Sequence, residues 1–273
     1  MSIKKEPNGR RSVQVEVEVP GSPEDVWQAI ATGPGVSAWF VPTRIETDAK
    51  GVPTRVFSDF GPGAGEAAAT VTAWEPPHRF AAENAWGPNS PVIATEWIVE
   101  AKSGGTCTVR VVHSLFADND DWDNQLIGTE SGWPAFFRVL KLYLSHFRGQ
   151  PSALIQVMGM TSGDQASAWR ELTNGLGLAG VSSGQRFKTA ASDLPALSGV
   201  VEQMANGNPD YNLLIRTDEP ASGAAILGVY ACGGPSQTMI SYYIYGKDAA
   251  AVAKRDQPKW QAWMTQHFPM PQM

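Results

Sequence analysis

The chain opens with a regular alternation of apolar and polar residues. Residues 13–19, VQVEVEV, alternate without a break, which is the period of a strand with one buried face. Residues 22–27, SPEDVW, then place a serine, a proline and an acidic residue at the spacing of a helix N-terminus. After a Gly-Pro-Gly break, a second short helix is expected over residues 36–40. The pattern therefore predicts a strand followed by two short helices.

A run of strands follows, separated by turns rich in glycine. The strands are expected over residues 54–60, 68–74, 79–84, 93–100 and 106–113. Residues 131–148, SGWPAFFRVLKLYLSHFR, then predict one amphipathic helix, because aromatic and leucine side chains recur at three- and four-residue spacing. Pro134 is expected in its first turn. Strands grouped together with helices set apart predict an α+β layer fold.

The second half repeats this order in shorter form. A strand is expected over residues 153–158 and a capping box over residues 161–164. Further strands are expected over residues 212–217, 224–232 and 241–246, followed by a helix, a proline and a second helix over residues 248–257 and 258–268. Aligning the turn at Ser103 with the turn at Ser222 places His113 over Cys232. The shared order predicts a diverged internal duplication.

Three segments follow from this repeat. Residues 1–12 are expected to be a flexible tail, residues 13–149 a first domain, and residues 150–273 a second, shortened copy of it.

Composition excludes several classes of function. Hydrophobic residues make up 42% of the 273 and charged residues 18%, which is typical of a globular protein. The net charge of −6 gives no basic footprint for nucleic acid, and no apolar stretch is long enough to span a membrane. The N-terminus lacks the apolar run of a signal peptide, and Cys107 and Cys232 are weak evidence for a disulfide. A cytoplasmic location is therefore expected.

Four short motifs resemble a known family. They are residues 22–27 (SPEDVW), 74–80 (WEPPHRF), 104–114 (GGTCTVRVVHS) and the pair Gly132-Trp133. Together they make residues 13–149 similar to the START-like (SRPBCC) superfamily, which includes polyketide cyclases and pollen allergens. The similarity is greatest to the subfamily named after the activator of heat-shock-protein ATPase. The second half matches only in outline and lacks the Glu-Pro-Pro element.

The resemblance implies a helix-grip fold. In such a fold a curved antiparallel sheet wraps around a long C-terminal helix, with a hydrophobic cavity between them. It does not fix the function, because the fold is shared by lipid carriers, cyclases, dehydratases and chaperone regulators.

Large aromatic side chains are the candidate wall of that cavity. A solid core would use mostly Leu, Ile and Val, so the many rings indicate a lined hollow, although they could also simply fill the core. Phe60 and Trp74 belong to this wall. The residues expected to contact a ligand are Trp39, Phe40, Phe57, Trp86, Trp97, His113, Trp133 and Phe137.

His113 is the candidate polar group of the cavity. It shares a strand face with Cys107, Val109 and Val111, so it points into the cavity or the core. It could bond a ligand, act as an acid or base, or be a core histidine bonded to a backbone carbonyl. A carboxylate could come from one of three glutamates whose direction the sequence leaves open, Glu66, Glu83 and Glu96.

Other motifs carry weaker signals. Residues 119–130 partly mimic a calcium loop but have Asn124 where glycine is required, so a solvated acidic loop is favoured. Residues 180–184, GVSSG, lack the strand and helix of a nucleophile elbow, and residues 61–65 lack the lysine of a phosphate loop. No metal site, cofactor or catalytic residue is assigned.

The favoured interpretation is a binding protein for a hydrophobic small molecule, aromatic or acyl, held beneath the long helix of the first domain. The second domain would serve as a packing partner. One alternative is an enzyme of the cyclase or dehydratase type that uses His113 as acid or base in the same cavity. Another is a chaperone cofactor or regulatory module, with a protein partner or a second copy of the chain bound to an exposed apolar patch.

Overall fold

The computed structural model describes residues 3–61, 65–85, 90–117, 120–189, 194–207, 210–230 and 236–270. The chain forms two compact units, Met1–Gly149 and Gln150–Met273, each with its own antiparallel sheet. Among the described residues, no helix is both long and apolar enough to cross a membrane.

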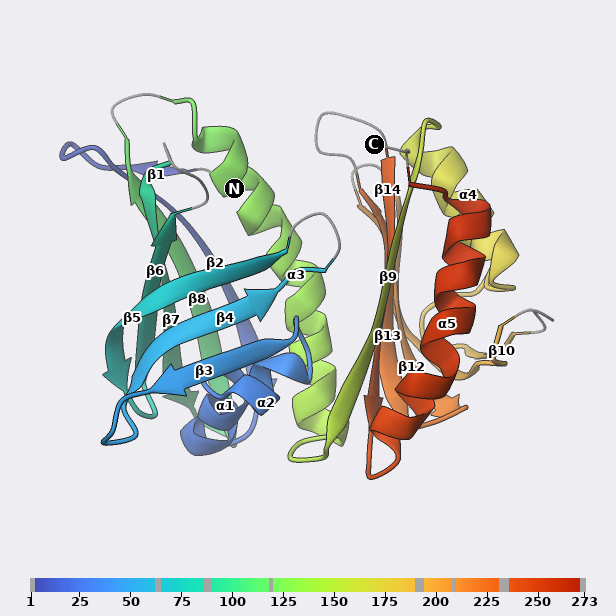
Figure 1. The fold of residues 1–273 in the computed structure, drawn as a ribbon, viewed down its shortest axis with the longest axis horizontal. Helices are drawn as coiled ribbons and strands as arrows, with labels where there is room; N and C mark the ends of the chain where they lie inside the picture. Colours follow the sequence, from blue (N-terminus) through green and yellow to red (C-terminus); the bar gives the residue numbers. More distant parts are fainter. Residues whose placement is uncertain are drawn as a thin grey trace. The chain divides into compact units, whose positions relative to one another are not determined.

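In the sheet of the first unit, strands β3 to β8 form an antiparallel meander, and the first long strand, β2, pairs with the last of them. Its order is β1-β2-β8-β7-β6-β5-β4-β3, so β8 lies between β7 and β2 (Figure 1). The strands are β1 Lys4–Lys5, β2 Arg10–Pro20, β3 Thr43–Thr47, β4 Pro53–Asp59, β5 Glu66–Glu75, β6 Arg79–Ala85, β7 Val92–Lys102 and β8 Thr106–Phe116. The α+β helix-grip prediction is confirmed, although β3 was not expected.

Two short helices follow β2. Helix α1 spans Pro23–Ile30, and its predicted capping box is present: Ser22 Oγ accepts from the Asp25 N–H, and the Asp25 carboxylate accepts from the Ser22 N–H. Helix α2 spans Gly33–Ser37 and so begins three residues earlier than expected. Thr32 caps it by accepting from the Gly35 N–H, which compensates for the weak helix formers in this segment.

The long helix α3 spans Asp123–His146 and packs against β2. It begins eight residues before the predicted start, so Pro134 lies inside the helix and not in its first turn. Gly128, Gly132 and Pro134 are poor helix formers, which hid the first two turns in the sequence. Tertiary packing forms them nonetheless, because Leu126 is fully buried in a cluster with Val13, Ile93 and Leu115.

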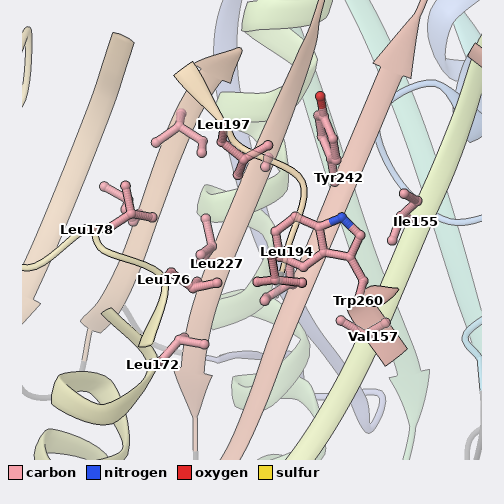
Figure 2. Close-up of a cluster of buried hydrophobic side chains, with 14 of the residues drawn as sticks. Ile155, Val157, Leu172, Leu176, Leu178, Leu194, Leu197, Leu227, Tyr242 and Trp260 are labelled. Carbon is pink, nitrogen blue, oxygen red and sulfur yellow. The ribbon is translucent and has the colours of Figure 1, made fainter. Parts of the chain in front are cut away.

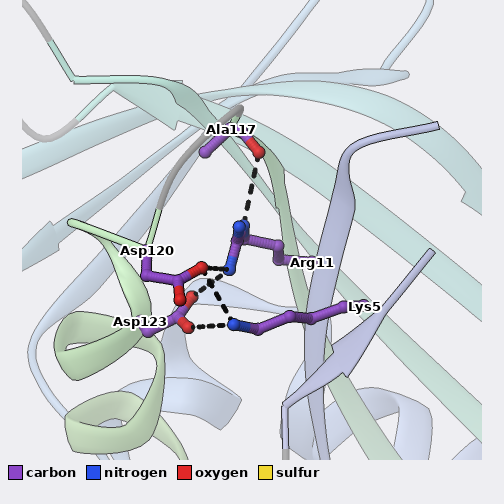
Figure 3. A network of polar contacts seen from close by, with 5 residues as sticks. All are labelled: Lys5, Arg11, Ala117, Asp120 and Asp123. Atoms are coloured by element: carbon purple, nitrogen blue, oxygen red, sulfur yellow. Dashed lines mark hydrogen bonds and ion pairs between the residues drawn. The ribbon is translucent and has the colours of Figure 1, made fainter. Parts of the chain in front are cut away.

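The N-terminal segment is tied down, contrary to the expected flexible tail over residues 1–12. Lys4 and Lys5 pair with Ser12 and Arg11 in the sheet. Ion pairs then join this segment to the start of α3, as Figure 3 shows. The contacts are Lys5 to Asp120 and Asp123 (2.9 and 2.8 Å), Arg11 to the same two carboxylates (2.8 and 2.7 Å), and Arg11 Nε to the Ala117 carbonyl oxygen (3.3 Å).

The second unit has a shorter sheet of the same kind, in the order β10-β11-β12-β13-β14-β9. Its strands are β9 Ser152–Thr161, β10 Arg186–Lys188, β11 Ser198–Gly207, β12 Asp210–Glu219, β13 Gly223–Tyr230 and β14 Ser236–Tyr245. Its helices are α4 Gln165–Gly175 and α5 Ala249–His267.

Two helix predictions for this unit need correction. Asp164, and not Thr161, caps α4, because its carboxylate accepts from the Ser167 N–H at 2.8 Å. Helix α5 runs through Pro258 as one element, where two helices were expected. Trp260, Trp263 and Met264, all buried just after the proline, provide the packing that offsets the hydrogen bond lost there.

Both units share one connectivity, which fits a tandem duplication. In each, the first long strand is followed by a capped helix and pairs with the last strand of a meander, and a long helix ends the unit. The strand equivalent to β8 is therefore β14, so the predicted alignment of His113 with Cys232 is wrong. Val13 lies nine residues before the helix cap Ser22, and Ile155 lies nine residues before the helix cap Asp164. The cross-strand partner of Val13 is His113 and that of Ile155 is Tyr242, so His113 is equivalent to Tyr242.

The interior of the second unit is a packed cluster of large apolar side chains. Trp260 of α5 and Tyr242 of β14 belong to it, together with leucines from α4 and the sheet (Figure 2). The Tyr242 hydroxyl bonds Thr217 Oγ1 and donates to the Ala221 carbonyl, both at 3.1 Å. At the position equivalent to His113, the second unit therefore has Tyr242, whose hydroxyl is hydrogen-bonded to residues of the same unit.

Candidate functional site

The first unit contains a partly open cavity of about 420 Å³ between its sheet and its helices. Strands β3 to β8 provide one wall, and α1, α2 and the N-terminal half of α3 provide the other. This volume lies within the range of small-molecule sites, about 300–1,000 Å³.

Four of the residues expected at the ligand site line this cavity: Phe40, Trp97, His113 and Trp133. Trp133 is at their centre, with its ring centroid 5.0 Å from those of both Phe40 and Trp97. Phe60, from the wider aromatic wall, lines the cavity as well, and so does Phe136. The rings meet edge to face or tilted, which is the arrangement that aromatic quadrupoles favour.

Three expected site residues lie outside the lining. Trp39 is fully buried and donates its indole N–H to the Ala29 carbonyl at 2.9 Å. Phe137 is buried behind Trp97 and Trp133. Phe57 points to the other face of β4, since its neighbours Val56 and Ser58 line the cavity.

The outer position of Phe57 has a clear physical reason. The Arg44 guanidinium lies 3.4 Å above its ring centroid, and the Arg55 guanidinium lies 4.5 Å away. These cation–π contacts cover the ring on the charged face of the sheet. Trp74 contacts Trp27 and Phe80 instead of the cavity. Trp86 lies outside the described residues.

Small residues create the space. Ala67 and Ala69 on β5 and Ala82 on β6 face Gly128 and Gly132 on α3, and all five line the cavity. A Cβ built on Gly128 or Gly132 would meet nothing within 4 Å. Reasoning from the aromatic residues missed this group. The sequence did contain a signal for it: the run AAAT in residues 67–70 places two alanines, Ala67 and Ala69, on the same face of a strand.

His113 is held by hydrogen bonds on both ring nitrogens. The Trp133 indole Nε1–H donates to His113 Nε2 at 2.7 Å, and His113 Nδ1 lies 3.0 Å from Thr95 Oγ1. An indole N–H can only donate, so Nε2 must be the unprotonated acceptor. The proton therefore sits on Nδ1 and is donated to Thr95 Oγ1, a tautomer assigned from this network.

The environment keeps this imidazole neutral. His113 is 7% exposed, and burial lowers its pKa from 6.5 to about 4. With both nitrogens engaged and the charged form disfavoured, His113 is poorly suited to exchange protons with a bound molecule near neutral pH. Its role in the site is to orient Trp133 and Thr95.

The three candidate carboxylates all point away from the cavity. Glu66, Glu83 and Glu96 each stand next to lining residues on their strands, so their side chains lie on the opposite face. Glu66 pairs with Arg44, and Glu96 pairs with Arg79. Among the described residues that line the cavity, none carries a charge.

The calcium-loop segment is largely helical. Residues 123–130 belong to α3, and Asp120 and Asp123 are engaged by Lys5 and Arg11. The expected solvated acidic loop is thus replaced by a helix start held through ion pairs. Cys107 is a free thiol buried beneath α1, with Sγ 3.3 Å from the Gly21 carbonyl oxygen, and burial raises its pKa.

Three solved structures are similar to this chain at low sequence identity. A crystal structure of CalU16 from Micromonospora echinospora is 17% identical over 53% of this chain and 83% of that one, with a TM-score of 0.41. The di-domain ARO/CYC BexL from the BE-7585A biosynthetic pathway is 12% identical over 96% of this chain and 100% of that one, with a TM-score of 0.45. The Aha1 dimer from Colwellia psychrerythraea is 20% identical over 50% of this chain and 96% of that one, with a TM-score of 0.38.

The match to a protein family is confined to the first unit. No curated protein matches the chain. The family model described as "Polyketide cyclase / dehydrase and lipid transport" matches residues 10–132, which include β2 to β8 and the cavity-lining start of α3. Residues 10–132 of the first unit are therefore similar to this family, in agreement with the START-like resemblance of the sequence.

Proposed function

We propose that the first unit binds a small, uncharged and mainly apolar molecule in the cavity between its sheet and α3. The observation that carries this proposal is an aromatic cavity of about 420 Å³ without a charged group among its described lining residues. A ligand charge would lose its hydration there and find no partner, at a cost of several kcal/mol. Apolar rings would gain contact area on Trp133, Phe40 and Phe136.

Binding is favoured over acid–base catalysis in this cavity. The cyclase or dehydratase alternative relied on His113, whose two nitrogens are both occupied and whose pKa is lowered by burial. No described carboxylate lines the cavity to take over that role. In the second unit, large apolar side chains fill the region equivalent to the cavity, so we assign the ligand to the first unit alone.

Filling the cavity tests the proposal. Ala69 lines the cavity, whereas Ala68, its neighbour on β5, faces solvent. Ala69→Leu is expected to weaken binding of 2-ethylnaphthalene, measured by isothermal titration calorimetry, by at least about ten-fold, because the added side chain occupies ligand volume. Ala68→Leu adds the same atoms on the other face and should bind like the parent protein.

Native mass spectrometry of the purified protein provides an independent check, since a co-purified small molecule would identify the ligand directly. The proposal fails if the parent protein binds no such probe and carries no small molecule. It also fails if Ala69→Leu and Ala68→Leu bind the probe equally well.

A further inference from the structure

The hydrogen bonds at His113 form a chain with a fixed direction. It begins at the Trp133 indole N–H, which cannot accept, passes through His113 from Nε2 to Nδ1–H, and reaches Thr95 Oγ1. Thr95 and His113 are direct cross-strand partners on β7 and β8, so the sheet register maintains this contact. Because Thr95 Oγ1 accepts a hydrogen bond from His113 Nδ1–H, its own hydroxyl proton must point elsewhere.

A census of the cavity hydroxyls singles out Thr95. The Thr43 hydroxyl donates to the Val41 carbonyl at 2.9 Å, which leaves Ser58 as the donor in its 3.4 Å contact with Thr43. The Thr129 hydroxyl donates to the Gln125 carbonyl at 2.9 Å. Among the hydroxyls of the described lining residues, only that of Thr95 keeps its proton free for the cavity.

We infer that the cavity selects ligands that present an uncharged hydrogen-bond acceptor, such as a ketone or ester carbonyl, to the Thr95 hydroxyl. This inference rests on the proposed function and adds the chemical class of the group that is recognised. Trp133 and His113 act as positioning residues, because they set the direction in which Thr95 donates.

Trp97 reinforces this preference for an acceptor, and Asn84 is compatible with it. The Trp97 indole N–H, which can only donate, has no acceptor in the described part of the chain, and Trp97 lines the cavity two residues from Thr95. Asn84 lines the cavity on β6, next to the Ala82–Thr95 pair, and its amide also lacks a hydrogen bond to the described residues. Its amide has two donors and one acceptor, so it can also donate to a ligand acceptor beside Thr95.

Two probes of nearly equal shape test the inference: 2-acetonaphthone, which carries a carbonyl, and 2-ethylnaphthalene, which does not. The parent protein is expected to bind 2-acetonaphthone about five-fold more tightly in calorimetry, after correction for the difference in hydration between the probes. Five-fold corresponds to about 1 kcal/mol, the net value of one neutral hydrogen bond.

Thr95→Val removes the hydroxyl at almost constant volume. It should lower the ratio of the affinity for 2-acetonaphthone to that for 2-ethylnaphthalene, and Thr95→Ser should retain the ratio of the parent protein. If both probes bind the parent protein equally, or if Thr95→Val keeps the full preference of the parent protein, the inference is wrong while the proposed function stands. If neither probe binds, the proposed function itself has failed.

Trp133→Phe tests the directional chain without altering Thr95. Without the indole donor, His113 can move its proton to Nε2 and accept from Thr95 at Nδ1, which withdraws the Thr95 proton from the cavity. The preference for 2-acetonaphthone should then fall, and nitrogen-15 NMR of His113 should change from the Nδ1–H form to a mixture of tautomers. An Nε2–H tautomer in the parent protein would contradict the inference directly.

Discussion

At the scale of single residues, one indole donor determines how the cavity is polarised. Trp133 donates its N–H to His113, lies nearly parallel to the same imidazole with an interplanar angle of 15°, and contacts Phe40 and Trp97. One side chain therefore supplies aromatic surface and also selects the histidine tautomer. A phenylalanine there would supply only the surface.

The buried imidazole also makes stability depend on pH. Its folded-state pKa of about 4 lies below the unfolded value of 6.5, so the unfolded chain binds the proton more readily between these values. The contribution of His113 is complete above about pH 6.5 and is lost as the pH falls towards 4. Between about pH 7 and pH 4.5 we expect His113 to account for a loss of roughly 2 kcal/mol in the free energy of unfolding.

Urea unfolding of the parent protein and of His113→Gln at both pH values isolates this contribution from the titration of surface carboxylates. The parent protein should lose about 2 kcal/mol more than the variant. Equal losses in the two proteins would show that His113 is already protonated, or exposed, in the folded state.

At the scale of elements, α3 combines a well-packed C-terminal half with an N-terminal half that depends on its neighbours. Gly128, Gly132 and Pro134 weaken the first half, and the ion pairs of Arg11 and Lys5 with Asp120 and Asp123 hold its beginning against β1 and β2. This is the half of α3 that lines the cavity. The N-terminal strands therefore contribute to the shape of the site without touching it.

Arg11→Met should loosen that half selectively. The variant keeps much of the side-chain volume but loses the ion pairs and the bond to the Ala117 carbonyl. We expect faster amide hydrogen exchange in residues 123–132, measured by mass spectrometry, and little change in residues 136–146, where the apolar packing is intact.

Arg110→Met is the matched control for this experiment. Arg110 pairs with Glu16 and Glu100 on the outer face of the sheet and has no contact with α3 among its recorded hydrogen bonds and ion pairs in the described chain. Its substitution should leave exchange in α3 unchanged. Equal effects of the two substitutions would mean that the ion pairs do not hold the helix start.

The sequence pattern predicted elements well where one face is buried and polar residues alternate with apolar ones, as in β2. It failed for β3, an edge strand whose Ile45 is only half-buried, and for the first turns of α3, whose stability comes from tertiary contacts that no local pattern encodes. It placed His113 on the inner face correctly. It could not separate Trp133 in the lining from Trp39 behind it, because periodicity indicates a face and not a depth.

At the scale of the whole molecule, two copies of one connectivity have different interiors. The first unit leaves a cavity among alanines, glycines and rings, whereas the second unit fills the equivalent region with Tyr242, Trp260 and leucines. The two units thus share a connectivity and differ in what occupies the interior beside the sheet.

The same substitution in the two units should have different consequences. Val157 is 1% exposed in the packed cluster of the second unit, so Val157→Ala should cost about 2 kcal/mol through lost burial and a new cavity. Val56 lines the existing cavity and is half-buried, so Val56→Ala should cost less than about 1 kcal/mol. Urea unfolding measures both, and equal costs would argue that the first unit closes around its cavity in solution.

The closing strand pair of each unit has a consequence for synthesis on the ribosome. Val13 pairs with His113, and Ser152 pairs with Tyr245, so each sheet joins residues from opposite ends of its own unit. The nascent first sheet stays incomplete until β8 has left the exit tunnel, but it needs nothing encoded after that point. Translation can therefore finish the sheet of the first unit while the second unit is still being made.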